Sequence, residues 1–213
     1  MFTTRLRTHT ILAVVSISVL LAAAVIGEPA AAVDQVSLAS AYLFLFLISV
    51  VLLLGPLRTL QTGRVMINQT LRRDIAIWCA LMGLVHLLAG SVESMTPVYL
   101  DVFVNHAVNS PSASTREALF FWSAIAGFII GLLLIVLLAL SNNWSLKLIG
   151  QRWWKRLHRL SYIVFILTVL HGFAFQVLES RFWGGYALVV VMTLIVCIAQ
   201  VLGIRAVAER EAS

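Results

Sequence analysis

The chain has 213 residues, of which 61% are hydrophobic and only 11% are charged. Soluble domains carry roughly 25% charged and 45–50% apolar residues, so this composition excludes an ordinary soluble domain and predicts a membrane protein. In a soluble protein the net charge of +6 would favour a nucleic-acid partner. Here we assign the excess of positive charge to cytoplasmic loops and expect membrane lipid, but no nucleic acid, as a partner.

Six apolar stretches are each long enough to cross about 30 Å of hydrocarbon as a helix. In chain order the predicted spans cover residues 10–27, 38–55, 75–92, 118–140, 157–178 and 183–204. The predicted fold class is therefore all-α, a polytopic bundle of six transmembrane helices in the cell (inner) membrane.

The first segment, residues 1–37, has a basic head, an apolar stretch and a run of small residues. A cleaved signal peptide has the same pattern, although the stretch from Ile11 to Ile26 is longer than the usual 7–15 residues. We expect a retained first helix with an outer loop, and cleavage of residues 1–32 is the alternative. Residues 38–204 then form the main membrane domain, and residues 205–213 form a cytoplasmic tail.

The basic residues are distributed unequally between the two sides of the predicted membrane domain. If the N-terminus is cytoplasmic, thirteen of the fifteen lysines and arginines fall inside, and only Arg116 and Arg181 fall outside. The positive-inside rule therefore predicts an even number of spans with both termini cytoplasmic. We also expect the spans to lack buried Asp or Glu, with Pro56 and Pro97 at span ends.

Three of the five histidines, His86, His158 and His171, fall in the predicted spans. We expect His9 to be solvated near the N-terminus and His106 to be solvated in the long outer loop; contact of His106 with a cofactor edge, a metal or a partner is the alternative. An ionisable side chain at membrane depth is costly and indicates a functional site. The other interpretation is a neutral histidine that hydrogen-bonds a neighbouring helix.

Depth distinguishes the two interpretations for His86 and His171. His86 lies thirteen positions after Arg73, and His171 lies twelve positions after Arg159. Both arginines mark the point where a helix enters the membrane from the inside, so both imidazoles lie about 18–20 Å from that entry, along helices that run in the same direction. Facing imidazoles on two such helices can supply both axial ligands of a b-type haem.

Glycines stand beside both predicted ligands. Gly83 lies one turn before His86, and Gly172 follows His171. Small residues there leave room for a macrocycle, although ordinary close helix packing predicts the same residues. We interpret Gly127 and Gly131 in the fourth span as packing residues only.

His158 lies about 20 Å from His171 along a continuous helix, so the two cannot bind one iron. It is a candidate ligand of a second, inner haem, or a lining residue of a quinone or flavin site; the alternative is a histidine at a helix entry. The basic residues around it are candidates for binding flavin phosphates, haem propionates or anionic lipid, or they report topology alone. These candidates include Arg73, Arg152 and Arg159.

Two segments carry a resemblance to a known family. LRRDIAIWCALMGLVHLLAG (residues 71–90) and LKLIGQRWWKRLHRLSYIVFILTVLHG (residues 146–172) resemble the ferric reductase-like transmembrane domain family. The resemblance implies haem ligation by His86 and His171, with His158 as the inner histidine. The chain departs from the oxidase members because it lacks a second histidine on the third span and a cytoplasmic flavin and nicotinamide domain. In both departures it is similar to the haem-binding membrane subunits of bacterial periplasmic methionine sulfoxide reductase systems.

The predicted function is transfer of electrons across the membrane. The donor would be a quinol or a flavoprotein at the cytoplasmic side, and the acceptor would be an outer partner. The chain would then be a haem-containing oxidoreductase subunit that lacks its own NAD(P)H domain. The alternatives are a proton-coupled transporter and a non-redox assembly subunit that uses the histidines structurally. The sequence identifies neither the donor nor the acceptor.

Overall fold

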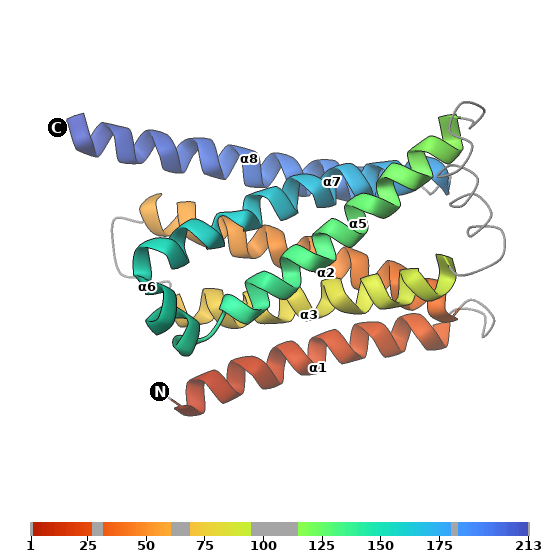
Figure 1. Ribbon diagram of the computed structural model, residues 1–213, viewed down its shortest axis with the longest axis horizontal. Coiled ribbons are helices and arrows are strands. Elements are labelled where there is room, and N and C mark those ends of the chain that lie inside the picture. The colour runs from red at the N-terminus through yellow and green to blue at the C-terminus, as the bar shows by residue number, and fades with distance from the viewer. Residues whose placement is uncertain (1, 27–31, 61–68, 95–114, 180–182, 213) are drawn as a thin grey trace.

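The computed structural model describes residues 2–26, 32–60, 69–94, 115–179 and 183–212. These residues form seven helices and no strand. The helices are α1 (Phe2–Ile26), α2 (Ala32–Leu60), α3 (Gln69–Ser94), α5 (Thr115–Leu140), α6 (Asn143–His158), α7 (Leu160–Leu178) and α8 (Trp183–Ala212). Figure 1 shows the long helices side by side, with both termini and the short α6 at the same end.

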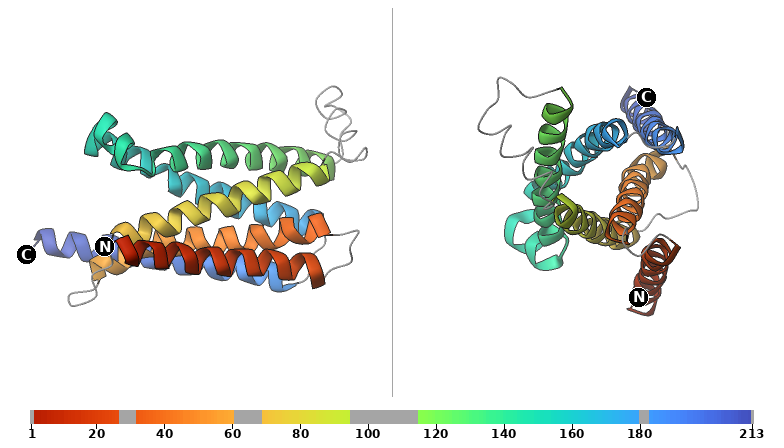
Figure 2. Two further views of the ribbon diagram at one scale, coloured as in Figure 1. Left: turned by 90° about the horizontal axis from the view of Figure 1, so that it is seen from below. Right: turned by 90° about the vertical axis from the view of Figure 1, so that its right-hand side faces the viewer.

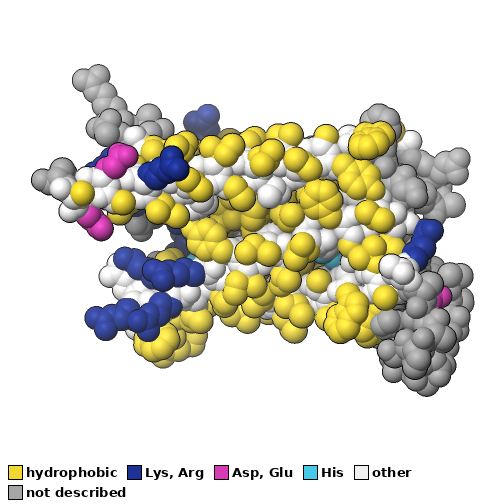
Figure 3. All heavy atoms as spheres, turned by 90° about the horizontal axis from the view of Figure 1, so that it is seen from above, with side chains coloured by type: hydrophobic (Ala, Val, Ile, Leu, Met, Phe, Trp, Pro, Cys, Tyr) yellow, Lys and Arg dark blue, Asp and Glu magenta, His cyan; other side chains and the backbone are white. Residues whose placement is uncertain are grey.

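Six of the helical segments are long and apolar enough to cross a membrane, with α6 and α7 forming one of them. This confirms the predicted all-α fold with six spans. Large apolar side chains are exposed along most of the helices, and Figure 3 shows them covering the middle of the bundle, whereas lysine and arginine gather mainly at the end that carries α6. Such a surface is stable in lipid, where the backbone polar groups must be satisfied within helices.

The core is organised around α2, which packs against α1, α3, α7 and α8. Looking down the bundle in Figure 2, α1 lies at the periphery and the other helices surround the centre. Leu52 of α2 and Val164 of α7 are almost completely buried. Ser49 and Thr168 are buried too, and each hydroxyl donates to the carbonyl four residues earlier in its own helix, which satisfies the polar group without a partner helix.

Several predicted boundaries were wrong. Pro56 lies inside α2 rather than at the end of a span, and α8 continues through the predicted tail to Ala212. Residues 143–158 form a further helix, α6, before α7 begins at Leu160, and the apolar segment of the fifth span covers both, Asn143–Leu178. Hydrophobic composition could not predict these helix ends, because the helix continues beyond the apolar stretch into polar residues in both α6 and the end of α8.

The prediction that no carboxylate is buried in the spans was also wrong. Asp74, near the start of α3, has a side chain that is only 2% exposed and accepts a 2.7 Å hydrogen bond from Nη2 of Arg5 in α1. His9, predicted to be solvated, lies between Asp74 and Trp78: its Nε2 is 3.3 Å from Oδ1 of Asp74, and the indole N–H of Trp78 donates to its Nδ1. Because an indole N–H can only donate, Nδ1 of His9 carries the lone pair and Nε2 carries the proton.

These contacts join α1 to α3. We expect Asp74→Asn to lower the free energy of unfolding by about 1–2 kcal/mol, because the amide carries no charge to pair with Arg5 and places an NH2 donor where one of the two carboxylate oxygens accepted from Arg5. The effect is limited because Arg5 is 39% exposed and stays partly solvated. Thermal unfolding of the detergent-solubilised chain, with hydrogen exchange of α1, measures the effect. Glu209→Gln, which removes an exposed carboxylate from α8, is the control, and an equal response of the two variants would contradict this role.

Candidate functional site

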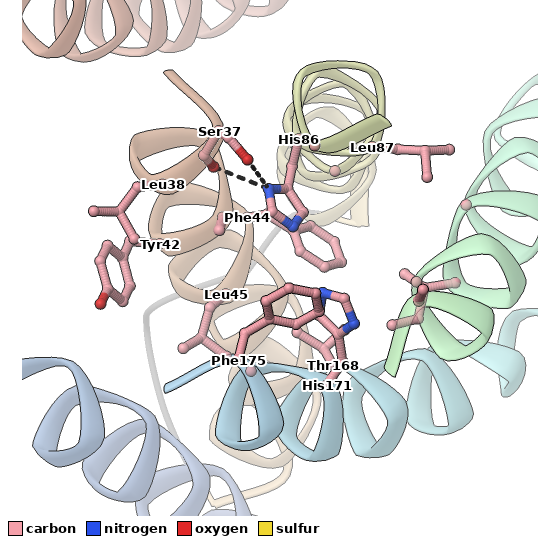
Figure 4. A pocket seen from close by; sticks show the side chains of 18 of the residues that line it. Ser37, Leu38, Tyr42, Phe44, Leu45, His86, Leu87, Thr168, His171 and Phe175 are labelled. Atoms are coloured by element: carbon pink, nitrogen blue, oxygen red, sulfur yellow. Dashed lines mark hydrogen bonds between the residues drawn. The ribbon is translucent and has the colours of Figure 1, made fainter. Parts of the chain in front are cut away.

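His86 of α3 and His171 of α7 face each other inside the bundle. Their ring centroids are 6.0 Å apart and their planes make an angle of 78°. Figure 4 shows both rings directed into the space between the two helices. The structure therefore brings together the two histidines that the depth argument placed at one level.

Each ring is held by a backbone carbonyl. Nδ1 of His86 lies 2.9 Å from the carbonyl oxygen of Ser37 in α2, and Nδ1 of His171 lies 2.8 Å from that of Ser123 in α5. A carbonyl can only accept, so each Nδ1 carries a proton and each lone pair is on Nε2. Anchoring of one nitrogen by a carbonyl is the usual arrangement of a histidine whose other nitrogen binds a metal.

A cavity of about 340 Å³ surrounds the two rings. Its lining comes from α2, α3, α5 and α7, with Val189 from α8, and is mostly apolar; the rings of Phe44, Phe120 and Phe175 are part of it. Phe175 also packs on His171, with centroids 4.8 Å apart. The volume lies within the range of protein sites for small molecules and cofactors, about 300–1,000 Å³.

Glycines line this cavity, among them Gly83 and Gly172, which the sequence placed beside the two histidines. Gly127 of α5 lines it as well, and a Cβ there would lie 3.1 Å from Cε1 of His171, so this glycine lets the ring pack against the helix. Gly83 and Gly131 do serve packing, because a Cβ there would meet Leu134 or Leu87.

One buried polar atom at the cavity lacks a partner among the described residues. Gln176 of α7 is 5% exposed and lines the cavity. Its Nε2 donates to the hydroxyl of Tyr42, but its Oε1 accepts no hydrogen bond. An unsatisfied buried amide oxygen is costly and can only accept, so this part of the cavity fits a ligand or a water that carries a hydrogen-bond donor.

His158 lies apart from this pair, at the C-terminal end of α6. Its ring stacks on Trp154 with centroids 3.8 Å apart, and its Nδ1 is 3.0 Å from the Trp154 carbonyl. The described part of the chain contains three other histidines. Two of them, His86 and His171, face each other, and the third, His9, contacts Asp74 and Trp78. No described histidine is therefore placed opposite His158.

The predicted basic residues do not line the cavity. Arg73 donates to the carbonyl of Ser141 and to the side chain of Asn143, and so fastens the turn between α5 and α6. Arg152 and Arg159 are exposed at the end of the bundle that carries the termini. His106 and Arg181 lie outside the described residues.

The sequence did not point to several residues of the site. Ser123 acts through its backbone carbonyl, which carries no residue-specific pattern, whereas Ser37 contacts His86 through its carbonyl and also through its hydroxyl, which lies 3.3 Å from Nδ1. Tyr42 and Gln176 are polar residues in apolar spans, and that property could have drawn attention to them.

The fold and the site define a class: a six-span helical membrane protein whose bundle encloses a cavity with two facing, carbonyl-anchored histidines. Comparison with curated proteins agrees with this class. The chain is similar to the haem-binding subunit MsrQ of protein-methionine-sulfoxide reductase from Yersinia pseudotuberculosis serotype O:1b (strain IP 31758), with 28% identity over 100 residues. MsrQ of Yersinia pestis (strain Pestoides F) matches to the same extent.

The match covers 47% of this chain and 43% of the Yersinia proteins, so it spans less than half the length of these relatives. No family model matches the chain, and no solved structure matches it. The six spans together with these relatives identify a multi-pass protein of the inner membrane. The wider ferric reductase-like family remains a prediction.

Proposed function

We propose that the chain binds one b-type haem between His86 and His171 and carries electrons across the membrane as the haem-binding subunit of a larger redox system. The observation that carries this proposal is the pair of imidazoles, 6.0 Å apart and each anchored through Nδ1. The relatives support it because they are named as haem-binding subunits.

The separation of the rings fits one metal ion between them. With a metal–nitrogen bond of about 2 Å on each side and about 1 Å from each nitrogen to its ring centre, two collinear imidazoles have centroids about 6 Å apart. The donor set fits as well, because two neutral imidazoles on facing helices are typical axial ligands of b-type haem in helical bundles. The unsatisfied Oε1 of Gln176 also favours a bound group in this cavity.

A haem bound there would supply one-electron chemistry at its iron. The carbonyls of Ser37 and Ser123 fix the tautomer and the orientation of the two ligand rings. Phe120 and Phe175 line the cavity and keep its environment apolar, which favours a ligand set without net charge. The chain's own residues thus bind and orient the group.

For the direction of transfer we propose a donor at the end of the bundle that carries α6 and both termini. The positive-inside rule assigns that end to the cytoplasm. A quinol or a separate flavoprotein would deliver electrons near His158, and a partner at the outer face would accept them. His158 is proposed as part of this entry site; a second haem on His158 would need a ligand other than the described histidines.

The competing interpretation is that the histidines are structural. Two imidazoles at 6.0 Å and 78° also satisfy the geometry of an edge-to-face ring pair, which needs no cofactor. Such a pair explains the contact, but not the unpartnered amide at the cavity. The buried carboxylate Asp74 is paired with α1 and does not line the cavity, although Asp34 and Glu179 are part of the lining. A transporter would therefore have to use these two carboxylates, and loss of transport in their amide variants is the observation that would favour it.

We expect the chain purified from haem-replete cells to contain about one haem b per polypeptide and to titrate with a single midpoint potential. The haem is quantified as its pyridine complex, and the potential is measured from the reduced-minus-oxidised α band. Colourless protein would contradict the proposal. Two resolved potentials would instead require a second haem and would assign His158 to it.

A further inference from the structure

The helix α6 lies between α5 and α7, at the end of the bundle that carries both termini. It forms the basic first part of the candidate span Asn143–Leu178, and cations at the end of a span indicate where the chain leaves the hydrocarbon. It consists of two short helical segments that meet at Gly150, whose φ of 76° is a conformation that glycine adopts without strain. The bend turns the chain back toward the bundle, as Figure 1 shows.

Several hydrogen bonds hold α6 in place. The side chain of Asn142 caps its first turn by accepting from the Ser145 N–H at 2.8 Å. The indole N–H of Trp154 donates to the carbonyl of Leu140 at 2.9 Å, and Arg73 of α3 donates to Ser141 at 2.6 Å. The face that α6 leaves uncovered is therefore a preformed surface.

The exposed side chains of α6 include large apolar ones and cations. Trp144, Leu148 and Trp153 are 72%, 66% and 59% exposed. The cations on and directly after the helix are all exposed as well: Lys147, Arg152, Lys155, Arg156 and Arg159. The guanidinium of Arg156 lies over the Trp153 ring, 4.9 Å from its centroid.

The charge on this face is unbalanced. The sequence contains no Asp or Glu between Glu117 and Glu179, and among the described residues no carboxylate forms a salt bridge with any of the five cations. Tryptophan gathers at the level of the lipid headgroups in membrane proteins, and cation clusters next to a span attract anionic headgroups. Both features of α6 match one environment, the interface of an anionic leaflet.

We propose that α6, with Arg159, binds the phosphate groups of anionic phospholipids in the leaflet at the end of the bundle that carries both termini. The indoles enter the interface, and the cations around them bind the lipid phosphates. Haem propionates are a poorer fit, because none of the five cations lines the cavity. A flavin is also a poorer fit, because one face of Trp153 is occupied by Arg156 and one face of Trp154 by His158.

The test uses the full chain in a nonionic detergent, titrated with dioleoyl phosphatidylglycerol or with dioleoyl phosphatidylcholine. Retained lipids are counted by native mass spectrometry. We expect phosphatidylglycerol to bind about tenfold more tightly than phosphatidylcholine. The combined variant R152Q/K155Q/R156Q/R159Q is expected to bind the two lipids equally, whereas R152K/R156K/R159K, which keeps the charges, is expected to retain the preference.

The matched control is R58Q/R205Q, which removes two exposed cations at the same end from α2 and α8 and is expected to keep the preference. An equal loss in this control would overturn the assignment to α6, and so would equal binding of both lipids by the unmodified chain. Inorganic phosphate and flavin mononucleotide are added as competitors. Displacement of phosphatidylglycerol by either at equal concentration would show that a free phosphate or a flavin, rather than a lipid, uses this surface.

The readout is independent of haem, because lipid retention is measured whether or not the chain is coloured. If the variant with four glutamines fails to fold, the double variant K155Q/R159Q provides the test. It is expected to lose part of the preference for phosphatidylglycerol over phosphatidylcholine. No loss in the pair, with the thermal unfolding temperature unchanged, would overturn the proposal.

Discussion

Replacing either His86 or His171 with alanine is expected to remove essentially all b-type haem from the purified chain. The physical reason is that each imidazole would supply one of only two protein ligands. Changes in the groups that merely support a metal-binding histidine cost about 10–100-fold in affinity, so loss of the histidine itself should cost more than about 100-fold. The measurement is the haem-to-protein ratio together with the reduced-minus-oxidised spectrum.

His158→Ala is the matched control, since it removes a third histidine that lies apart from the cavity and stacks on Trp154. This variant should keep one haem with an unchanged α band. Thermal unfolding of all three variants, each prepared without haem, separates loss of the ligand from loss of the fold. Retention of the full spectrum in both His86→Ala and His171→Ala would refute the proposed ligation.

Enlarging Gly127 should have the second largest effect. A Cβ at this position would already lie 3.1 Å from Cε1 of His171, and the larger side chain in Gly127→Leu has no space unless the imidazole moves. Overpacking of this kind costs about 1–3 kcal/mol, which corresponds to a loss of about 5–150-fold in haem affinity. Haem titration of the apoprotein measures the change.

Two other glycines provide controls for this variant. Gly203→Ala in α8 brings a Cβ to 3.0 Å from the Cβ of Pro56, away from the cavity lining, and should lower stability while leaving haem affinity nearly unchanged. Gly55→Ala meets no atom within 4 Å and should be neutral in both measurements. If Gly127→Leu bound haem as tightly as Gly55→Ala, then Gly127 would not make the space for the His171 ring.

The number of spans followed from the sequence because each crossing needs a long apolar helix. The same requirement does not define where a helix stops. The chain continues as helix past Pro56 in α2 and past residue 204 in α8, and it forms α6 where a plain connection was expected. Outside the hydrocarbon, helix ends depend on caps and on packing, such as the bonds of Asn142 and Arg73 around α6.

The two facing histidines could be predicted because the rise of a helix converts residue counts into depth. What surrounds them could not be predicted in this way. The acceptors on Ser37 and Ser123 are backbone carbonyls from two other helices, and the contact of Gly127 with His171 depends on how closely α5 approaches α7. These depend on the rotation and spacing of helices, which hydropathy does not encode.

The sequence by itself determined that this chain is a six-span helical membrane protein, because apolar length and the distribution of charge are properties of each segment alone. It also predicted that His86 and His171 lie at one level, and the structure places their rings 6.0 Å apart. Only the tertiary structure decided that Asp74 binds Arg5 of α1, that Gln176 has an unpartnered oxygen at the cavity, and that Arg156 lies over the exposed indole of Trp153. Each of these depends on which helix faces overlap, and that is set by packing between segments distant in the chain.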